Sequence, residues 1–204
     1  MNLSYRIGHI MFRAFARSFY DFRVIGEENL KLPGAALVVA NHVSFMDPPF
    51  IGQAFDEAIY FFARKSLFDH PMAGKLLRSW HSIPIDRDKP DASSLKTTIR
   101  LLKSGKKVLM FPEGTRSYDG QPMKAEAGVG LFIAKSNAPV LPVRIHGTFE
   151  AYPRGAKFIR PARIRLVVGK SYQPDLKARA AAEGRDLYQS LADEVMDRIS
   201  ELTL

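Results

Sequence analysis

The residues best suited to chemistry in this sequence are a histidine and an aspartate separated by four residues, His42 and Asp47. A histidine beside a carboxylate can act as a general base. The carboxylate fixes the imidazole tautomer and stabilises the imidazolium that forms when the ring accepts a proton. The pair therefore predicts removal of a proton from a hydroxyl group. Taken alone, it also fits a surface histidine near a helix-capping aspartate.

The hydroxyl could belong to the protein or to a substrate. Ser44 lies between His42 and Asp47, but it lacks the Gly-x-Ser-x-Gly sequence that exposes a nucleophilic serine at a tight turn. A serine hydrolase that uses Ser44 is therefore kept only as an alternative. A substrate that brings its own hydroxyl needs no protein nucleophile, and His42 would then activate that group directly.

A second polar segment, Glu113-Gly114-Thr115-Arg116, predicts an anion site. Glycine permits a tight turn with exposed amides, and arginine can bind phosphate oxygens through two parallel hydrogen bonds. Glu113 could orient Arg116 or contact a substrate hydroxyl. Arg87 ends a third segment, residues 83–87, and could add a second charge to the same phosphate. An ordinary surface turn or ion pair is the alternative for each segment.

Metal and nucleotide sites are not expected. The chain has no cysteine and no His-Glu-x-x-His sequence, which argues against thiolate sites and zinc-protease sites. The other histidines are scattered, and we expect them to be structural. Neither Gly-x-x-x-x-Gly-Lys-Ser/Thr nor Gly-x-Gly-x-x-Gly occurs, so a phosphate loop for nucleotides and a dinucleotide site are not predicted either.

Length and charge limit the class of protein further. The 204 residues suit one domain, and 46% apolar with 25% charged residues is typical of a globular protein. Lys and Arg outnumber Asp and Glu by 30 to 21, which gives a net charge of +9. This excess predicts an anionic partner: a phosphate-bearing substrate, an anionic membrane surface or a nucleic acid. Residues 151–174 contain six bases and no acid, and they form either a partner surface or a solvated strand and loop.

The polar segments must be positioned by the elements that precede them. Apolar runs such as 36–40 and 108–111 do not alternate, so they predict strands covered on both faces. The expected fold is α/β, with a mostly parallel central sheet flanked by helices. Because ligands bind beyond the carboxyl ends of parallel strands, both polar segments should open onto the same edge. The expected strands are 22–25, 36–40, 59–63, 82–86, 108–111, 140–145 and 164–168, and the expected helices include 91–103, about 125–136 and an amphipathic closing helix.

Residues 1–22 are expected to form an amphipathic helix in the membrane interface, ahead of the main domain, 23–204. At helical spacing, Arg6, Arg13 and Arg17 fall on one stripe. The opposite side is broad and apolar: Leu3, Ile7, Ile10, Met11, Ala14, Phe15, Phe19 and Phe22. This pattern suits a helix that lies in the lipid interface, and packing on its own domain is the alternative. Neither a signal peptide nor a spanning helix is expected, so the predicted location is the cytoplasmic face of a membrane, peripheral or monotopic.

Taken together, these segments resemble the glycerolipid acyltransferase family. Asn41-His42-x4-Asp47 is similar to the His-x4-Asp motif of that family, and Phe111–Ser117 is similar to its phosphate-binding motif. Residues 63–68 and 83–87 resemble the second block and residues 140–143 the fourth, all in the order of the family. The resemblance covers about residues 23–170. The Glu-Gly-Thr-Arg form is most similar to the branch that acylates 1-acyl-sn-glycerol 3-phosphate.

The resemblance implies transfer of a fatty acyl group from a thioester, on coenzyme A or acyl carrier protein, to the free hydroxyl of a lysophospholipid, giving phosphatidic acid. It implies His42 as general base, with Asp47 orienting it. A thioester is already activated, so no resident cofactor and no covalent enzyme intermediate are expected. Backbone amides near His42 are expected to stabilise the oxyanion. The implied substrate-binding positions are Lys65, Arg87, Glu113, Gly114, Thr115 and Arg116.

Three alternatives stay open from the sequence. The same motifs could serve another acceptor, such as glycerol 3-phosphate, another lysophospholipid or a lyso-aminolipid. A non-catalytic module for anionic lipid or RNA would explain the charge but not the His/Asp and Glu/Arg segments, so a nucleic acid is not the expected partner. The third alternative is the serine hydrolase that uses Ser44. The segment of about 22 residues before the first strand favours an interfacial helix over membrane-embedded helices.

Overall fold

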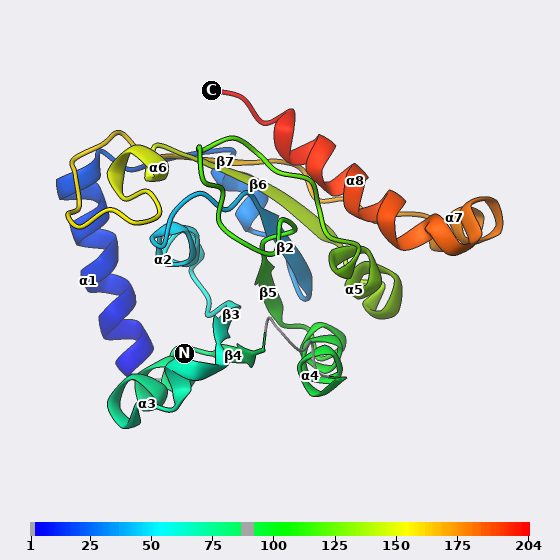
Figure 1. Ribbon diagram of the computed structural model, residues 1–204, viewed down its shortest axis with the longest axis horizontal. Helices are drawn as coiled ribbons and strands as arrows, with labels where there is room; N and C mark the ends of the chain where they lie inside the picture. The colour runs from blue at the N-terminus through cyan, green and yellow to red at the C-terminus, as the bar shows by residue number, and fades with distance from the viewer. Residues whose placement is uncertain (1–2, 87–91) are drawn as a thin grey trace.

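The structure, a computed structural model, describes residues 3–86 and 92–204 and is built around one seven-stranded sheet (Figure 1). The strand order is β1-β7-β6-β2-β5-β3-β4. The strands from β6 to β4 run parallel to one another, whereas β7 pairs antiparallel with β6 and parallel with β1. The strands are β1 (Arg23–Ile25), β2 (Ala36–Ala40), β3 (Tyr60–Arg64), β4 (Ser82–Ile85), β5 (Lys107–Met110), β6 (Val140–His146) and β7 (Arg165–Val168).

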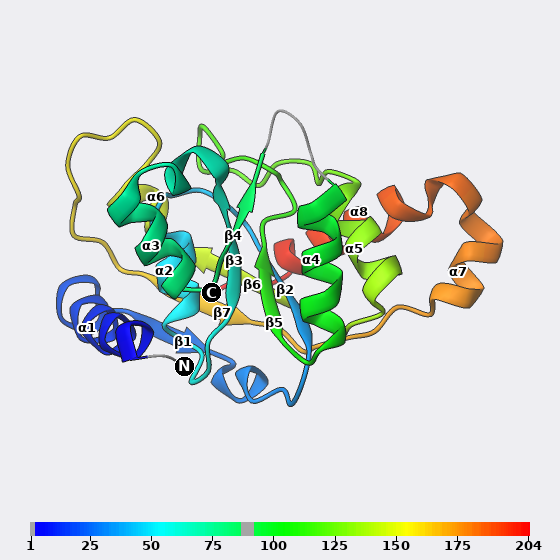
Figure 2. The same ribbon diagram turned by 90° about the horizontal axis from the view of Figure 1, so that it is seen from below.

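Helices cover both faces of this sheet, as Figures 1 and 2 show. One core contains side chains of α1 (Leu3–Tyr20), α2 (Asp47–Gly52) and α6 (Thr148–Ala151), and the other contains side chains of α4 (Ala92–Lys103), α5 (Gly128–Ser136) and α8 (Leu187–Ser200). Strand β2 supplies alternate residues to the two cores, which is why all five of its residues are buried. The remaining helical segments are α3 (Pro71–Ser79), α7 (Leu176–Glu183), η1 (Glu27–Leu30), η2 (Lys65–Phe68) and η3 (Gly184–Asp186).

The sequence-based fold class is confirmed. Each of the seven expected strands overlaps an observed one, and 36–40 has the same bounds. The helix expected at 91–103 begins at Ala92 in the described residues, and the helix expected from about 125 begins at Gly128. The antiparallel direction of β7 was not predicted, because hydrophobic pattern reports burial but not strand direction.

The amino-terminal helix α1 packs on the domain through one narrow face. Tyr5, Ala16 and Tyr20 are buried, and the His9 ring lies 2.8 Å from the carbonyl oxygen of Phe55. The broad apolar side is largely exposed to solvent, with exposed fractions of 41% to 72% for Leu3, Ile7, Ile10, Met11, Phe15 and Phe19. Packing against the domain therefore buries only the narrow face of α1 and leaves its broad apolar side exposed. Within the described ranges, no helix combines the length and apolar character needed to span a bilayer.

Helices α5 and α8 approach each other closely at Gly130. A Cβ atom built on Gly130 would lie 1.9 Å from the carbonyl oxygen of Tyr188. A Cβ built on Gly128, at the start of the same helix, would meet nothing within 4 Å. The two glycines that interrupt the helical pattern therefore differ: only Gly130 is required by packing.

We expect Gly130→Ala to lower the free energy of unfolding by about 1–3 kcal/mol or more, because the methyl group forces α8 away from α5. Gly128→Ala is the matched control. It should be neutral or should stabilise by up to about 1 kcal/mol, since alanine favours the helix and has room. Urea unfolding of both variants measures the difference. Equal stabilities would contradict this account of the α5–α8 contact.

Candidate active site

The two polar segments lie next to each other because β2 and β5 are parallel neighbours. Val39 pairs with Met110 in register, so the segments that follow β2 and β5 leave the sheet at the same edge. Two hydrogen bonds then join the segments directly. The His42 amide donates to Glu113 Oε1 at 2.8 Å, and the Ser117 amide donates to the His42 carbonyl at 2.8 Å. Residues about 70 positions apart along the chain therefore form one site.

Asp47 is the centre of the His42 segment. Its carboxylate is fully buried, and Oδ2 lies 2.8 Å from His42 Nδ1 and accepts the amides of Val43 and Ser44, each at 2.8 Å. Asp47 is also the first residue of α2, so the helix fixes the carboxylate while the two amides fold the preceding loop around it. Oδ2 therefore accepts two backbone amides and also faces the histidine ring, so the loop and the ring are ordered by one oxygen atom.

The His42 ring is held in one orientation by two contacts. Nδ1 faces Asp47 Oδ2, the oxygen that accepts the Val43 and Ser44 amides, so we assign the proton to Nδ1 and leave Nε2 as an acceptor. On its flat side the ring stacks on Phe111, with ring centres 3.9 Å apart and planes inclined by 15°. The His42 side chain is only 8% exposed. Such a ring can accept a proton at Nε2 while Asp47 stabilises the resulting imidazolium.

Glu113 connects the segments through backbone amides. Oε1 accepts the His42 amide and Oε2 accepts the Met123 amide at 3.3 Å, while the residue is 3% exposed. Burial raises the pKa of Glu113 to about 7, although the two amide hydrogen bonds act in the opposite direction. The nearby charge of Asp47 raises that pKa further. The sequence predicts Glu113 as a substrate-binding residue. In the structure both of its oxygens accept backbone amides, one from His42 and one from Met123.

The turn after Glu113 carries the candidate anion-binding residues. Gly114 has φ +67°, a left-handed backbone conformation that residues with a Cβ atom rarely adopt. Thr115 is half-buried and belongs to the same turn. The Arg116 guanidinium lies over the exposed Phe45 ring, 5.5 Å from its centre, so it is held beside the His42 segment. Arginine and histidine from different segments therefore border one site.

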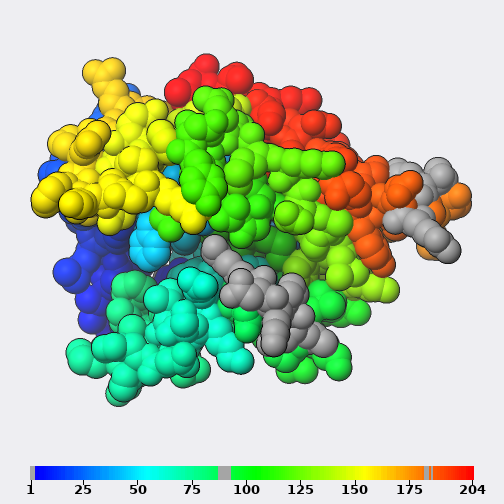
Figure 3. Space-filling view, viewed as in Figure 1, coloured from blue at the N-terminus to red at the C-terminus, as the bar shows by residue number. Residues whose placement is uncertain are grey.

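Two further expected site residues, Lys65 and Arg87, do not belong to either of these segments. Lys65 is exposed and begins η2 directly after β3, which is parallel to β5, so it lies at the same edge of the sheet. Arg87 lies outside the described residues. Figure 3 shows a hollow on this face, bordered by the green segment after β5, the yellow segment after β6 and the teal segment after β3.

Two sequence-based ideas are changed by the local hydrogen bonds. Ser44 is fully buried and donates its hydroxyl to the Tyr152 carbonyl at 2.7 Å, which removes the basis for a serine nucleophile. The amides of His42, Val43 and Ser44 all donate to Glu113 or Asp47, so they do not form the expected oxyanion site.

Asn41 has a structural part in the site that sequence reasoning missed. Its side-chain amide donates to the Ile145 carbonyl at 3.0 Å and accepts the Ile145 amide at 2.8 Å, which holds the end of β2 against β6. Its position directly before His42, at the end of an apolar run, is the signal that could have indicated this contact.

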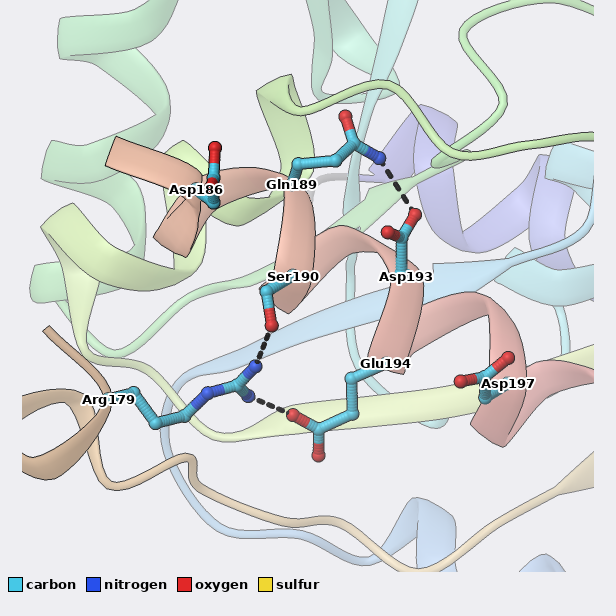
Figure 4. Close-up of a pocket in the computed structure, with 7 residues that line it drawn as sticks. All are labelled: Arg179, Asp186, Gln189, Ser190, Asp193, Glu194 and Asp197. Atoms are coloured by element: carbon cyan, nitrogen blue, oxygen red, sulfur yellow. Dashed lines mark hydrogen bonds and ion pairs between the residues drawn. The ribbon is translucent and has the colours of Figure 1, made fainter. Parts of the chain in front are cut away.

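A separate hollow of about 490 Å³ lies against α7 and α8, and it has the opposite electrostatic character (Figure 4). Arg179 bonds to Glu194 and to Ser190 Oγ, and the other lining side chains are mainly acidic. Among the described residues, no group of three or more His, Asp or Glu side chains is placed to hold a metal ion. An acidic surface of this kind repels anions, so this hollow does not suit a phosphate-bearing ligand.

Comparisons with known proteins agree with this geometry. The family model described as Acyltransferase matches residues 21–146. The chain is 28% identical over 182 residues to a 1-acyl-sn-glycerol-3-phosphate acyltransferase of Bacillus subtilis, covering 88% of this chain and 87% of that protein. It is 30% identical over 156 residues to the chloroplastic enzyme LPAT1 of Arabidopsis thaliana, covering 74% of this chain and 44% of that longer protein.

A solved structure is also similar over nearly the whole chain. The 1-acyl-sn-glycerophosphate (LPA) acyltransferase PlsC of Thermotoga maritima superposes with a TM-score of 0.78 at 30% sequence identity. The match covers 97% of this chain and 79% of that one. The similarity therefore includes the sheet, both helical layers and the edge at which the two polar segments meet.

The raised pKa of Glu113 gives a pH-dependent stability. Between pH 4.5 and about 7, the Glu113 carboxyl keeps its proton in the folded protein but loses it in the unfolded chain. The free energy of unfolding therefore falls as the pH rises through that range. Glu113→Gln removes the titration. We expect the wild type to lose about 1–3 kcal/mol relative to this variant across the window, as measured by urea unfolding. Parallel stability curves would show that Glu113 is not held in a desolvated site.

Proposed function

This chain belongs to the acyltransferase family, and from that premise we propose that it transfers a fatty acyl group from a thioester to the free hydroxyl of 1-acyl-sn-glycerol 3-phosphate, giving phosphatidic acid. The observation that carries the proposal is the direct hydrogen bonding between the His42 and Glu113 segments, which brings a base and an arginine to one place. The names of the relatives agree with this acceptor.

His42 is the general base of the proposed reaction. Nε2 takes the proton of the acceptor hydroxyl as its oxygen attacks the thioester carbonyl carbon. The resulting tetrahedral oxyanion collapses, the carbon–sulfur bond breaks, and the proton passes from His42 to the departing thiolate. Asp47 stabilises the imidazolium between these two transfers. The reaction consumes one hydroxyl and one thioester and yields one ester and one thiol.

The acceptor phosphate is proposed to bind at the turn after Glu113. Arg116 can offer two parallel donors to phosphate oxygens, and Gly114 and Thr115 form the tight turn that carries it. Lys65 lies at the same edge and adds a cation. Arg87 is proposed alongside them from its position in the motif. Glu113 is a positioning residue, because both of its oxygens bind backbone amides.

The acyl donor is proposed to be coenzyme A or an acyl carrier protein, and no resident cofactor or metal ion takes part. Both donors present the same thioester, and the proposed chemistry of His42 is identical for each.

We further propose that the protein works on the cytoplasmic face of a membrane through α1. Both substrates carry acyl chains, and the exposed apolar stripe of α1 is suited to the lipid interface. Arg6 and Arg17 are exposed on the same helix and would meet anionic headgroups, while Arg13 pairs with Asp56.

We expect His42→Ala to lower kcat by about 100- to 10,000-fold, since proton transfer by a positioned side chain contributes in that range. The measurement is the release of free thiol from an acyl thioester in the presence of 1-acyl-sn-glycerol 3-phosphate. Circular dichroism and urea unfolding establish that the variant is folded. Near wild-type turnover in a folded His42→Ala protein would refute the assignment, and a wild type that releases no thiol would indicate a binding module.

Arg116→Gln should weaken use of the acceptor rather than the donor. Loss of one charge-assisted contact costs on the order of 1.5–3 kcal/mol, so kcat/KM for the acceptor should fall roughly 10- to 150-fold. Arg100→Gln, at an exposed position of α4, is the matched control for loss of one charge. A panel of acceptors with one labelled donor completes the test. An unchanged KM for every phosphate-bearing acceptor would place the phosphate elsewhere.

A further inference from the structure

Residues 152–163, which connect α6 to β7, form an exposed basic loop that the proposed reaction does not use. The loop contains no Asp or Glu and four basic residues: Arg154, Lys157, Arg160 and Arg163. All four are exposed. Across the described ranges none of them pairs with a carboxylate, and Arg154 instead lies over the Tyr118 ring at 4.2 Å. The loop therefore presents uncompensated positive charge to its surroundings.

The tip of this loop is apolar as well as basic. Phe158 is 79% exposed and Ile159 is 50% exposed, and Lys157 and Arg160 flank them. Two neighbouring large apolar side chains at the tip of a loop are unfavourable in water, because apolar surface is stabilised by removal from it. Cations on both sides of an apolar pair match a bilayer surface, in which an anionic headgroup layer overlies an apolar interior.

The loop is held in place by hydrogen bonds at its base. The Arg160 amide donates to the Ala151 carbonyl at 2.8 Å, which closes the chain behind the tip, and the Tyr152 carbonyl accepts the Ser44 hydroxyl at 2.7 Å. Immediately after the loop, the Ile164 amide donates to the Tyr20 carbonyl, the last residue of α1. The tip is therefore held out from the domain between the His42 segment and the end of α1.

The loop and α1 lie at the same end of the molecule, as both ribbon views show (Figures 1 and 2). Figure 3 shows the yellow segment protruding beside the green segment that contains the Glu113 turn. Helix α1 and the loop with the apolar tip therefore lie at one end of the molecule, and the Ser44–Tyr152 hydrogen bond places the loop beside the His42 segment.

We propose that the 152–163 loop is a second membrane-contact element, with Phe158 and Ile159 entering the interface of an anionic bilayer and the flanking cations binding its headgroups. The occupant is a bilayer because the tip combines both features that an anionic lipid surface recognises. An acidic protein would satisfy the cations but would leave the two apolar side chains without a partner. The inference rests on the proposed membrane association of α1 and is independent of the acyl-transfer chemistry.

The absence of cysteine permits a site-specific test in the intact 204-residue chain. Phe158→Cys, Met11→Cys and Ser104→Cys are each labelled with an environment-sensitive fluorophore. Position 11 lies on the exposed stripe of α1, and position 104 is exposed just before β5, at the opposite edge of the sheet. With vesicles of phosphatidylglycerol and phosphatidylcholine, positions 158 and 11 should both gain intensity with a blue shift, and position 104 should not change.

The outcomes separate the two membrane proposals. A response at position 11 with silence at position 158 overturns this inference and leaves the α1 proposal standing, whereas silence at both refutes both. An equal response at position 158 to vesicles of phosphatidylcholine alone would overturn the part played by the cations. A response at position 158 to an acidic carrier protein but not to vesicles would also overturn the inference.

Unlabelled variants provide the second measurement. Phe158→Ser combined with Ile159→Ser should weaken co-sedimentation with anionic vesicles on the order of tenfold, because the apolar area that enters the interface is lost. Lys157→Gln combined with Arg160→Gln should weaken it by roughly 25-fold, since each base near an anionic surface strengthens binding roughly fivefold. Leu204→Ser, at another exposed apolar position, is the control. Binding by both double variants equal to that of the control would contradict the proposal.

Discussion

The parallel pairing of β2 with β5 is the constraint on which the site depends. Two polar segments far apart in the chain leave the sheet at one edge because their strands run side by side in the same direction. The His42 amide and the Glu113 carboxylate then fix their relative position. On one side Asp47 orders the ring and its own loop, and on the other the Gly114 turn carries Arg116. Any change in the β2–β5 register would separate the base from the cation.

Much of this arrangement was predictable from residue pattern. Unbroken apolar runs indicate buried parallel strands, and polar segments directly after them indicate the functional edge. Hydrogen bonds between segments were not predictable, because residue types do not report which backbone amides a side chain reaches. The sequence therefore indicated Glu113 as a substrate contact, although both of its oxygens bind amides. Likewise, backbone amides near His42 were expected to stabilise the oxyanion, yet those of Val43 and Ser44 bind Asp47.

The helical pattern of α1 shows a similar limit. Periodicity separates an apolar side from a basic stripe, but it does not say whether the apolar side meets the domain or the surroundings. The structure shows that Tyr5, Ala16 and Tyr20 pack inward, while the broader stripe stays exposed. Figure 1 places α1 and the 152–163 loop at one end and the acidic α7–α8 surface towards the other. Charge and apolar surface are thus distributed so that one end suits an anionic interface.

The central claim is that one imidazole and one guanidinium act on the same acceptor molecule. The most direct measurement is a crystal structure of the protein bound to 1-acyl-sn-glycerol 3-phosphate without a donor. The account predicts the phosphate on Arg116 and the free hydroxyl within hydrogen-bond distance of His42 Nε2. A well-ordered acceptor whose hydroxyl points away from His42 while its phosphate binds elsewhere would contradict the account.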